Sequence, residues 1–367
     1  MKRRILITAF MGLCTYAVNA QTVSYLTKVW EYCPAPGQFI HELPAYEPGD
    51  DAEAMAKKCL DNLYHDNLVC LGAYGGYMTV GFDHKILNIE GQKDLLVYGN
   101  ANKWGTSAEP GIVLVSADTN NDGIPNDEWY ELAGSEYDNP ATLHNYEITY
   151  TRPASDDMDV PWTDNRGGSG VVKYMGLVAG TYNHQHAHYP KWIQSNTLTF
   201  RGARLPDNGA LDATDGIWKM KAYEYGYADN QYSEDGCSFD IDWAVDNAGG
   251  KVHLESIDFV RIYTAVNQHI GGGVGEISTE ISGVQDLHPT ATAIHETAGE
   301  TPLIVHYQNN SLTIGYESPV PVYLYNMQGA LLRQWQHEGG TVSTPLNTGK
   351  GIYILQIGNR KQKVFIK

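Results

Sequence analysis

The sequence predicts an all-β protein: a jelly-roll-like β-sandwich with one short N-terminal helix, followed by a small C-terminal Ig-like β-sandwich. Three observations support this prediction. The 367 residues include 25 Tyr, 38 Gly and 16 Pro, a composition typical of short strands joined by many turns. Short β-type runs recur along the chain with Gly, Asn and Pro between them. A helical spacing of apolar residues occurs near the N-terminus.

The first 20 residues have the pattern of a secretory signal peptide. Basic residues 2–4 precede a mostly apolar stretch over residues 5–18, and Val18-Asn19-Ala20 is a small-x-small cleavage site. That stretch is too short to cross a membrane, and no later run approaches ~20 apolar residues. The sequence therefore predicts an exported protein without a membrane span.

Four cysteines follow the signal peptide: Cys33, Cys59, Cys70 and Cys237. An even number in an exported protein permits two disulfides, with three possible pairings. Four buried free thiols are the alternative, because the spacing matches no known disulfide framework. Both interpretations stay open.

The next elements are one helix and a series of strands. Asp51 precedes apolar residues spaced by three and four over 52–63, which predicts an amphipathic helix. Short β-type runs then occupy residues 77–82, 94–98, 112–116, 146–150, 197–200 and 257–263. Their regular spacing predicts a ligand-binding β-sandwich over residues 21–284.

A poorly patterned linker over 285–301 separates this region from a small sandwich over 302–367. The strands expected there are 311–316, 320–326, 330–335, 351–357 and 361–366. The net charge of the chain is −18, yet its last 78 residues hold six basic and four acidic side chains. The acidity therefore belongs to the first region, and it excludes nucleic acid and anionic lipid as partners.

An acidic turn is the sharpest chemical signal. Oxygen-bearing residues alternate over 118–127, with Gly123 where the chain bends, as a calcium loop requires. The candidate ligands are Asp118, Asn120, Asp122, the carbonyl of Ile124, and Asn126 or Asp127. Trp129 stands where an EF-hand has its bidentate Glu, so the loop resembles calcium turns of β-rich extracellular proteins. The alternative is a turn whose Asp and Asn side chains cap their own backbone.

Aromatic residues beside amides and carboxylates form a second candidate site. The residues expected to contact a ligand are Trp162, Asn165, Arg166, Trp192, Tyr225 and Tyr227. Flat rings among polar groups suit a sugar face or the amide-fringed corrin ring of a cobamide, since both have apolar faces with polar edges. The alternative is that these rings are core residues of a Tyr-rich sandwich.

Histidines suggest a third site. In His184-Gln-His186-Ala-His188, strand geometry would place the imidazoles on one face, about 6.8 Å apart. That spacing is too wide for all three to bind one ion, so a solvated loop is the favoured interpretation. His186 or His269 is a candidate ligand of a cobalt ion.

Catalytic patterns are weak. The sequence lacks a nucleophile elbow and a convincing phosphate-binding loop. Paired carboxylates such as Asp156/Asp157 arise by chance in so acidic a chain, so they do not predict a glycosidase. A non-enzymatic protein is therefore expected.

The C-terminal region resembles the type IX (Por) secretion sorting domain of Bacteroidetes. The resemblance rests on residues 322–329 (VYLYNMQG), 346–353 (LNTGKGIY) and the basic end 361–367 (KQKVFIK). It implies export across the outer membrane or display on it.

The middle of the chain resembles a family of secreted cell-surface proteins of gut Bacteroidetes. The motifs are 71–84 (LGAYGGYMTVGFDH), 97–101 (VYGNA), 109–113 (EPGIV), 127–137 (DEWYELAGSEY) and 225–230 (YGYADN). Members are associated with outer-membrane vitamin B12 transporters, and some bind cobamides. The resemblance implies a protein that captures cobamides outside the cell for a transporter. The alternative is a calcium-stabilised carbohydrate-binding module for extracellular glycans.

Overall fold

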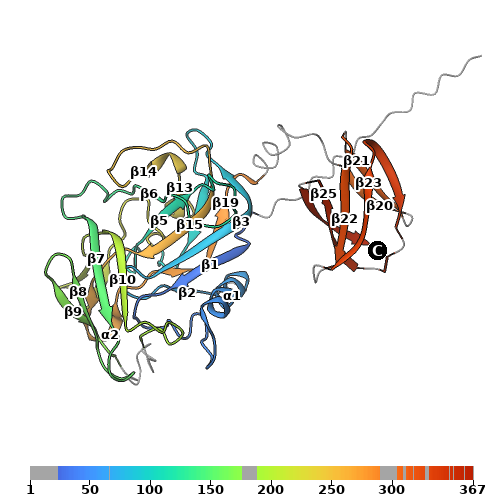
Figure 1. Ribbon diagram of the computed structural model, residues 1–367. Helices are drawn as coiled ribbons and strands as arrows, with labels where there is room; N and C mark the ends of the chain where they lie inside the picture. The colour runs from blue at the N-terminus through green and yellow to red at the C-terminus, as the bar shows by residue number, and fades with distance from the viewer. Residues whose placement is uncertain are drawn as a thin grey trace, which may run out of the picture. The chain divides into compact units, whose positions relative to one another are not determined.

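The structure is a computed structural model that describes residues 24–65, 67–175 and 188–289, and residues 304–366 apart from 309–310, 317, 327–329, 347, 350 and 359. Strands account for 43% of the residues and helices for 7%. The predicted all-β sandwich with one short helix is therefore confirmed (Figure 1). The chain divides into two compact units, Met1–Thr292 and Ala293–Lys367. The signal-peptide prediction lies outside the described residues.

A six-stranded antiparallel sheet forms the centre of the first unit. Its strands lie in the order β1-β3-β15-β5-β6-β14 (Figure 1). Their bounds are Lys28–Cys33 (β1), Tyr77–Leu87 (β3), Ser256–Thr264 (β15), Gly111–Ser116 (β5), Tyr130–Leu132 (β6) and Ala244–Val245 (β14). The middle strands β3, β15 and β5 are mostly buried, and β15 and β5 are rich in Val and Ile, as expected where side chains pack on both faces.

One face of this sheet carries the first hydrophobic core. The side chains that alternate onto this face are Val29, Met78, Val80, Val113, Val115, Val260 and Ile262. Helix α1 (Ala52–Tyr64) packs against β1, and a three-stranded sheet, β13-β4-β19, adds further apolar side chains to the same core.

Helix α1 begins at the cap that the sequence predicts. The Asp51 carboxylate accepts a hydrogen bond from the backbone N–H of Ala54 at 2.9 Å. Its buried residues are Met55, Ala56, Cys59 and Leu63, which follow the predicted spacing. Strand β1 was not predicted, because a bulge between Val29 and Glu31 breaks its alternation.

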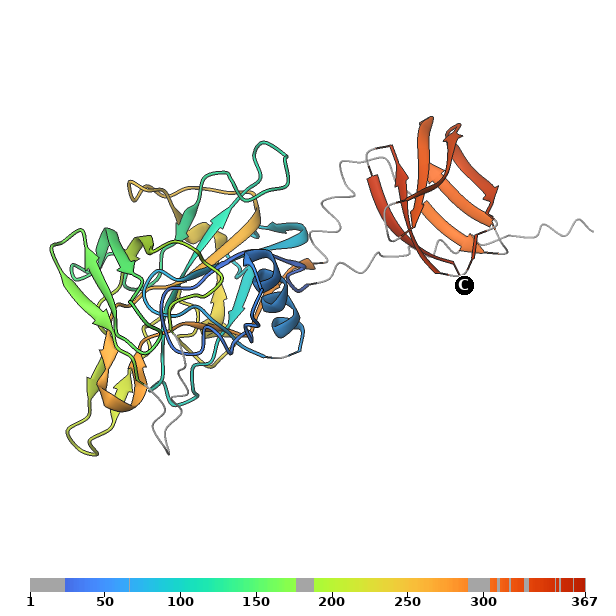
Figure 2. The same cartoon turned by 60° about the horizontal axis from the view of Figure 1, so that its bottom comes forward.

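A four-stranded sheet covers part of the second face of the six-stranded sheet. Its order is β10-β7-β8-β9, with bounds Thr197–Arg204, Leu143–Thr151, Val160–Asp164 and Ser169–Val172. Figures 1 and 2 show these green strands to one side of the central sheet. Tyr146, Tyr150 and Phe200 pack with Ile112 and Tyr263 of the central sheet in a second core.

Short elements complete the first unit. They are β2 (Val69–Cys70), β4 (Leu95–Tyr98), β11 (Gly209–Leu211), β12 (Trp218–Met220), η1 (Asp235–Cys237), β13 (Ser238–Phe239), η2 (Ile241–Trp243), β16 (His269–Ile270), α2 (Gly271–Val274), β17 (Gly275–Glu276), β18 (Glu280–Ile281) and β19 (Gly283–Asp286). None of the helices in the described ranges is long and apolar enough to cross a membrane.

The second unit is a small sandwich of two sheets. One sheet has the order β20-β21-β24 and the other β23-β22-β25-β26. The bounds are Ile304–Gln308 (β20), Ser311–Tyr316 (β21), Val320–Asn326 (β22), Leu331–His337 (β23), Gly340–Pro345 (β24), Gly351–Ile357 (β25) and Arg360–Ile366 (β26). Leu312, Ile314, Val322, Leu324 and Leu355 are fully or almost fully buried between the sheets.

The first residues of the expected linker belong to the first unit. Gln285 and Asp286 pair with Leu96 and Leu95 as the end of β19. Strand β19 thus runs two residues past the predicted boundary at 284, and its four residues are too few for an alternating pattern to reveal a strand. Most of the expected linker, from residue 290 onward, lies outside the described residues.

The four cysteines after the signal peptide are free thiols in the structure. The sequence left disulfides and free thiols open, and the structure has free thiols. Burial raises the pKa of Cys33 to about 12 and that of Cys237 to about 11, and it raises those of Cys59 and Cys70 well above the usual range. All four are therefore protonated at neutral pH and have low reactivity.

Candidate functional site

A row of five side chains crosses the second face of the six-stranded sheet. In the strand register the row runs Glu31, Thr79, Arg261, Leu114 and Glu131. Directly opposed residues project to the same side of a sheet, so all five face away from the first core. Because neighbouring strands lie about 4.8 Å apart, the row is about 19 Å long. We call this row, together with Tyr77 and Trp129, the open face.

Arg261 is fixed at the middle of the open face. Its guanidinium lies 4.5 Å from the ring centroids of both Tyr77 and Trp129. Its Nε donates to Oγ1 of Thr79 at 2.8 Å, and Nη2 lies 3.3 Å from a carboxylate oxygen of Glu31. These contacts join both aromatic rings, Thr79 and Glu31 to one cation.

Glu131 stands at the other end of the row. Among the described residues, none donates a hydrogen bond to its carboxylate or forms an ion pair with it. Burial alone raises the pKa of Glu131 to about 7. The side chain is only partly exposed, and its cross-strand neighbours are Leu114 and Val245. The open face therefore ends in a carboxyl group whose hydrogen-bonding capacity is unused by the described protein.

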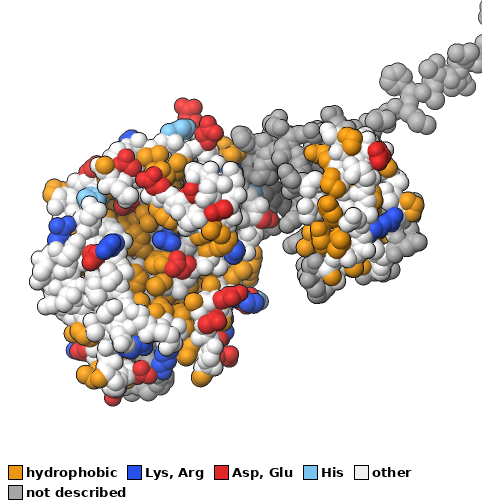
Figure 3. All heavy atoms as spheres, viewed as in Figure 1, with side chains coloured by type: hydrophobic (Ala, Val, Ile, Leu, Met, Phe, Trp, Pro, Cys, Tyr) orange, Lys and Arg blue, Asp and Glu red, His pale blue; other side chains and the backbone are white. Residues whose placement is uncertain are grey.

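A cleft of about 380 Å³ lies where the open face meets β10. It is lined by Gly75, Tyr77, Leu114, Thr199, Phe200, Arg201, Arg261 and Tyr263. In the space-filling view, hydrophobic side chains gather in the middle of the first unit with basic side chains among them (Figure 3). Pockets for small molecules have volumes of about 300–1,000 Å³, so the size of this cleft fits a ligand-binding role, and its walls are both polar and apolar.

A larger groove, about 960 Å³, lies between α1 and the edge strand β1. Trp30 and Glu31 line it, and Glu31 also ends the row of the open face. The ring of Trp30 is covered by the Lys28 ammonium, which lies 3.0 Å from its centroid. A ligand larger than the 380 Å³ cleft can thus extend along the open face toward this groove.

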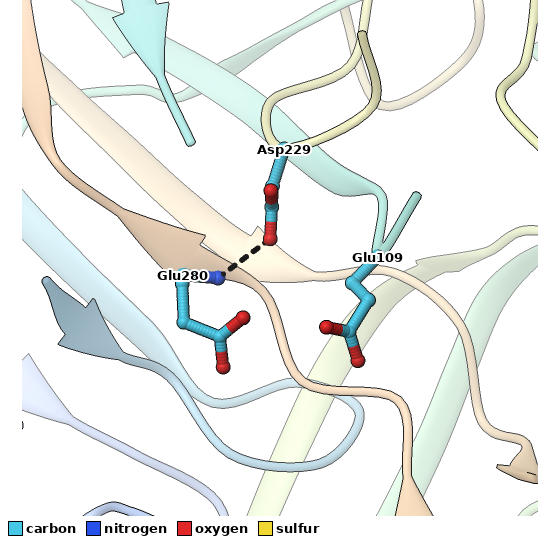
Figure 4. Close-up of side chains that lie close together, drawn as sticks. All are labelled: Glu109, Asp229 and Glu280. Carbon is cyan, nitrogen blue, oxygen red and sulfur yellow. Dashed lines mark hydrogen bonds between the residues drawn. The ribbon is translucent and has the colours of Figure 1, made fainter. Parts of the chain in front are cut away.

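A second candidate site is a buried trio of carboxyl groups: Glu109, Asp229 and Glu280. One ligand oxygen of each lies within 4.8 Å of those of the other two, and Figure 4 shows the three side chains converging. In the described part of the chain, this is the only set of three Asp, Glu, His or Cys side chains that meets this criterion. Oxygen ligands at such spacing are those of a calcium or magnesium site.

Backbone N–H groups hold the trio in place. Asp229 accepts from the N–H groups of Asn100 at 2.5 Å and Glu280 at 2.9 Å, and Glu109 accepts from the N–H of Ser278 at 3.0 Å. The strands and turns that carry these donors therefore position the carboxyl groups before any ion or proton is added.

Burial shifts the titration of the trio. It raises the pKa of Glu109 to about 8 and that of Asp229 to about 7, and it raises that of Glu280 well above its usual range. The charge of Asp229 raises the pKa of Glu109 further. Glu109 and Asp229 also raise the pKa of Glu280, because each adds negative charge beside it. Protons or a cation must therefore lower the charge of this cluster.

The trio was not found from the sequence. Glu109 and Asp229 belong to the motifs 109–113 and 225–230, which carry the family resemblance. Their separation along the chain hides their proximity. The available signal is an acidic residue directly beside buried apolar ones, as in Ala228-Asp229 and Glu280-Ile281.

The acidic loop 118–127 forms a hydrogen-bonded turn. Asp118 accepts from the N–H groups of Asp122 at 3.1 Å and Gly123 at 2.8 Å, and Asn120 donates to Asp122 at 3.0 Å. Asp127 accepts from the Thr119 hydroxyl, and Ile124 is 43% exposed. These contacts match the self-capping alternative, and the carboxylates do not form a close set of three. Calcium binding here stays a prediction.

Two of the expected ligand residues are core residues. Trp192 is 6% exposed and stacks between Tyr32 and Tyr46, with ring centroids 5.6 and 5.8 Å away. Tyr227 is fully buried, and its hydroxyl accepts the N–H of Glu136 at 2.9 Å. The expectation that these rings contact a ligand is therefore corrected: both are used in packing, as the alternative interpretation stated.

The other expected ligand residues lie apart from the open face. Trp162 and His269 line one small pocket of about 80 Å³. Asn165 and Arg166 are exposed in the turn after β8 and hydrogen-bond the carbonyls of Asn145 and His144. Tyr225 is 43% exposed, and its ring lies 5.1 Å from that of Trp243. The structure therefore does not join these residues into one site.

Of the three clustered histidines, His184 and His186 lie outside the described residues. His188 is buried, and its Nε2 lies 3.2 Å from the carbonyl oxygen of Val172. Burial lowers the pKa of His188, so it is neutral at physiological pH.

Comparisons with known proteins identify no family. No protein-family model matches the chain, and no curated protein matches it. Among solved structures, a β-glucuronidase from Ruminococcus gnavus in complex with uronic deoxynojirimycin is 10% identical, with a TM-score of 0.15 over 91% of this chain and 39% of the enzyme. A pullulanase from Bacillus acidopullulyticus is 11% identical, with a TM-score of 0.13 over 80% of this chain and 34% of the enzyme. This chain thus spans less than half the length of these structures, and such low scores carry no argument about fold or function.

Proposed function

We propose that this chain is an exported, non-enzymatic binding protein that captures a cobamide on the open face. The observation that carries the proposal is the pair of aromatic rings, Tyr77 and Trp129, that contact Arg261 in the same row as Glu131, whose carboxyl has no partner among the described residues. A corrin ring has apolar faces fringed by amide groups, so it needs flat apolar contacts and hydrogen-bond partners at its rim. The resemblance of residues 32–288 to cobamide-associated surface proteins supports the same ligand.

The spacing of acidic groups on the open face favours binding over hydrolysis. Glu31 and Glu131 lie at opposite ends of the row, about 19 Å apart. The two carboxyl groups of a glycosidase lie about 5–10 Å apart, which is the distance that its mechanism needs. Glu31 is also paired with Arg261 and accepts from the Tyr77 hydroxyl at 2.6 Å.

A spectral titration with cyanocobalamin, alongside calorimetry, tests the proposal. We expect binding at micromolar protein that weakens about 10-fold or more in Trp129→Ala and Arg261→Ala, because each removes part of the open face. Trp104→Ala is the matched control, since Trp104 is 73% exposed and belongs neither to the open face nor to the lining of the 380 Å³ cleft. Absence of cyanocobalamin binding by the wild-type protein would refute the proposal.

A carbohydrate-binding module is the second candidate. It is favoured by the same combination of aromatic rings with charged side chains, which suits the apolar face and hydroxyl rim of a pyranose. A glycan-array signal lost in Trp129→Ala, with no response to cyanocobalamin, would support it over the cobamide proposal. A signal lost instead in Trp162→Ala would place the glycan at the 80 Å³ pocket.

Display on the cell surface is the remaining part of the proposal. The resemblance of residues 302–367 to a type IX sorting domain supports transport by that route, and handover to an outer-membrane transporter would follow. Deleting residues 302–367 should leave the protein in the periplasm of a type IX-competent host, as detected by cell fractionation. Unchanged surface exposure of the deletion variant would contradict this role.

A further inference from the structure

The open face differs chemically at its two ends. At the Glu31 end every polar group is paired: the Arg261 guanidinium donates to Thr79 and Glu31, and Glu31 also accepts from the Tyr77 hydroxyl. At the other end Glu131 has no such partner among the described residues. The open face therefore has one carboxyl group available for a bound molecule.

Apolar groups frame this carboxyl. Leu114 separates Glu131 from Arg261 in the row, and Trp129, two residues earlier on the same face, stacks on Arg261. A ligand lying flat on Trp129 and Leu114 thus brings its rim to Glu131. Above pH 7 the carboxyl of Glu131 is ionised and only accepts hydrogen bonds, so at that pH the group at the rim must donate one.

No described residue donates a hydrogen bond to this carboxyl. Adjacent strand positions hold Leu114 and Val245, neither of which can donate. The charge of Glu131 raises the pKa values of the tyrosines Tyr74, Tyr137, Tyr227 and Tyr263. The hydroxyls of Tyr74 and Tyr263 donate to the carbonyl of Ala203, and that of Tyr227 accepts the N–H of Glu136. A partly buried acceptor without a donor is costly, and a ligand that supplies the donor recovers this cost on binding.

We infer that Glu131 is a specificity-determining residue that selects ligands with an N–H or O–H donor, such as a primary amide, at the edge of an apolar face. This inference rests on the proposed function and deepens it. A ligand that carries a carboxylate at the same position meets like-charge repulsion and is rejected.

The test uses cyanocobalamin and its monocarboxylic acids, in each of which one side-chain amide is hydrolysed. For the wild-type protein we expect one of these acids to bind at least 10-fold more weakly than cyanocobalamin. Glu131→Gln keeps the shape, can both donate and accept, and should restore binding of that acid. Glu131→Ala should weaken the binding of cyanocobalamin itself about 10- to 100-fold, because a hydrogen bond to a charged group is lost. Glu128→Gln, an exposed carboxylate three residues earlier, is the control and should change nothing.

The outcomes separate the two proposals. If cyanocobalamin binds but Glu131→Ala and Glu131→Gln leave its affinity and the ranking of the acids unchanged, the role of Glu131 is refuted and the cobamide proposal stands. If cyanocobalamin does not bind, the cobamide proposal fails, and the same variants are compared on the strongest glycan of an array. Equal glycan binding by wild-type and Glu131→Ala proteins, or no glycan signal, then refutes the role of Glu131 as well.

Discussion

Raising the pH should destabilise the first unit, because the buried carboxyl trio binds protons more tightly when folded than when unfolded. Glu109 has an ordinary pKa of 4.5 and a folded pKa of about 8. A group whose folded pKa is raised contributes stability that is fully present below its unfolded pKa. That stability is lost as the pH rises through the folded value. The loss from Glu109 therefore develops between pH 4.5 and pH 8.

The magnitude follows from the size of the shift. One pKa unit corresponds to about 1.4 kcal/mol, so Glu109 alone lowers the free energy of unfolding by about 3 kcal/mol between pH 4.5 and pH 7. Asp229, Glu276 and Glu131 each have a pKa of about 7 and act in the same direction. Exposed carboxylates such as Asp212, whose pKa is lowered to about 2, act in the opposite direction at lower pH.

Urea denaturation followed by tryptophan fluorescence, from pH 4.5 to 8 in EDTA, measures this effect. Glu109→Gln removes the titrating group, so its stability relative to wild type should improve by about 3 kcal/mol between pH 4.5 and 7. This difference in pH dependence is the readout, so the absolute stability of the variant does not affect it. Glu128→Gln, at an exposed position, should run parallel to wild type. Parallel profiles for Glu109→Gln and wild type would refute the reasoning.

Three further predictions follow from the same contacts. Adding a chelator should lower the melting temperature of the protein. If the loop 118–127 holds calcium, the chelator should no longer lower the melting temperature of Asp122→Ala. If only Glu280→Gln loses the effect of the chelator, the ion lies at the trio. Gly99→Ala should destabilise the protein by about 1–3 kcal/mol in urea, because its Cβ would lie 2.4 Å from Cα of Asp229; Gly283→Ala, whose Cβ would lie 3.4 Å from Tyr98, should cost less. Cys59 and Cys70 should resist iodoacetamide at pH 8 in the native protein and react fully in denaturant without a reductant; a need for reductant would reveal a disulfide.

The sequence predicted the elements whose patterns are local. Helix α1 was recognisable because its cap and its apolar stripe lie within a few turns of the chain. Strands β21, β22 and β25 were predicted to the residue because turn residues bound each of them. Strand β1 and the end of β19 were missed. A bulge interrupts the alternation of side chains in β1, and β19 has only four residues, too few to show an alternating pattern.

The candidate sites were much harder to predict from the sequence. The aromatic residues chosen from the sequence proved to be divided among the core, turns and a small pocket, because composition does not tell which side of a strand faces a neighbour. Trp192 and Tyr227 sit beside polar residues in the chain, yet both rings are buried. Exposure depends on what packs above a residue, and that is a property of distant segments.

By itself the sequence determined the all-β class, the short helix and the acidic character of the first region, because these depend on composition and local periodicity. The tertiary structure alone decided which residues meet. Strand register aligned Glu31, Arg261 and Glu131 from three separate parts of the chain, and turns brought Glu109, Asp229 and Glu280 within 4.8 Å of one another. Cross-strand partners are set by the packing of whole sheets, so no local pattern encodes such a pairing.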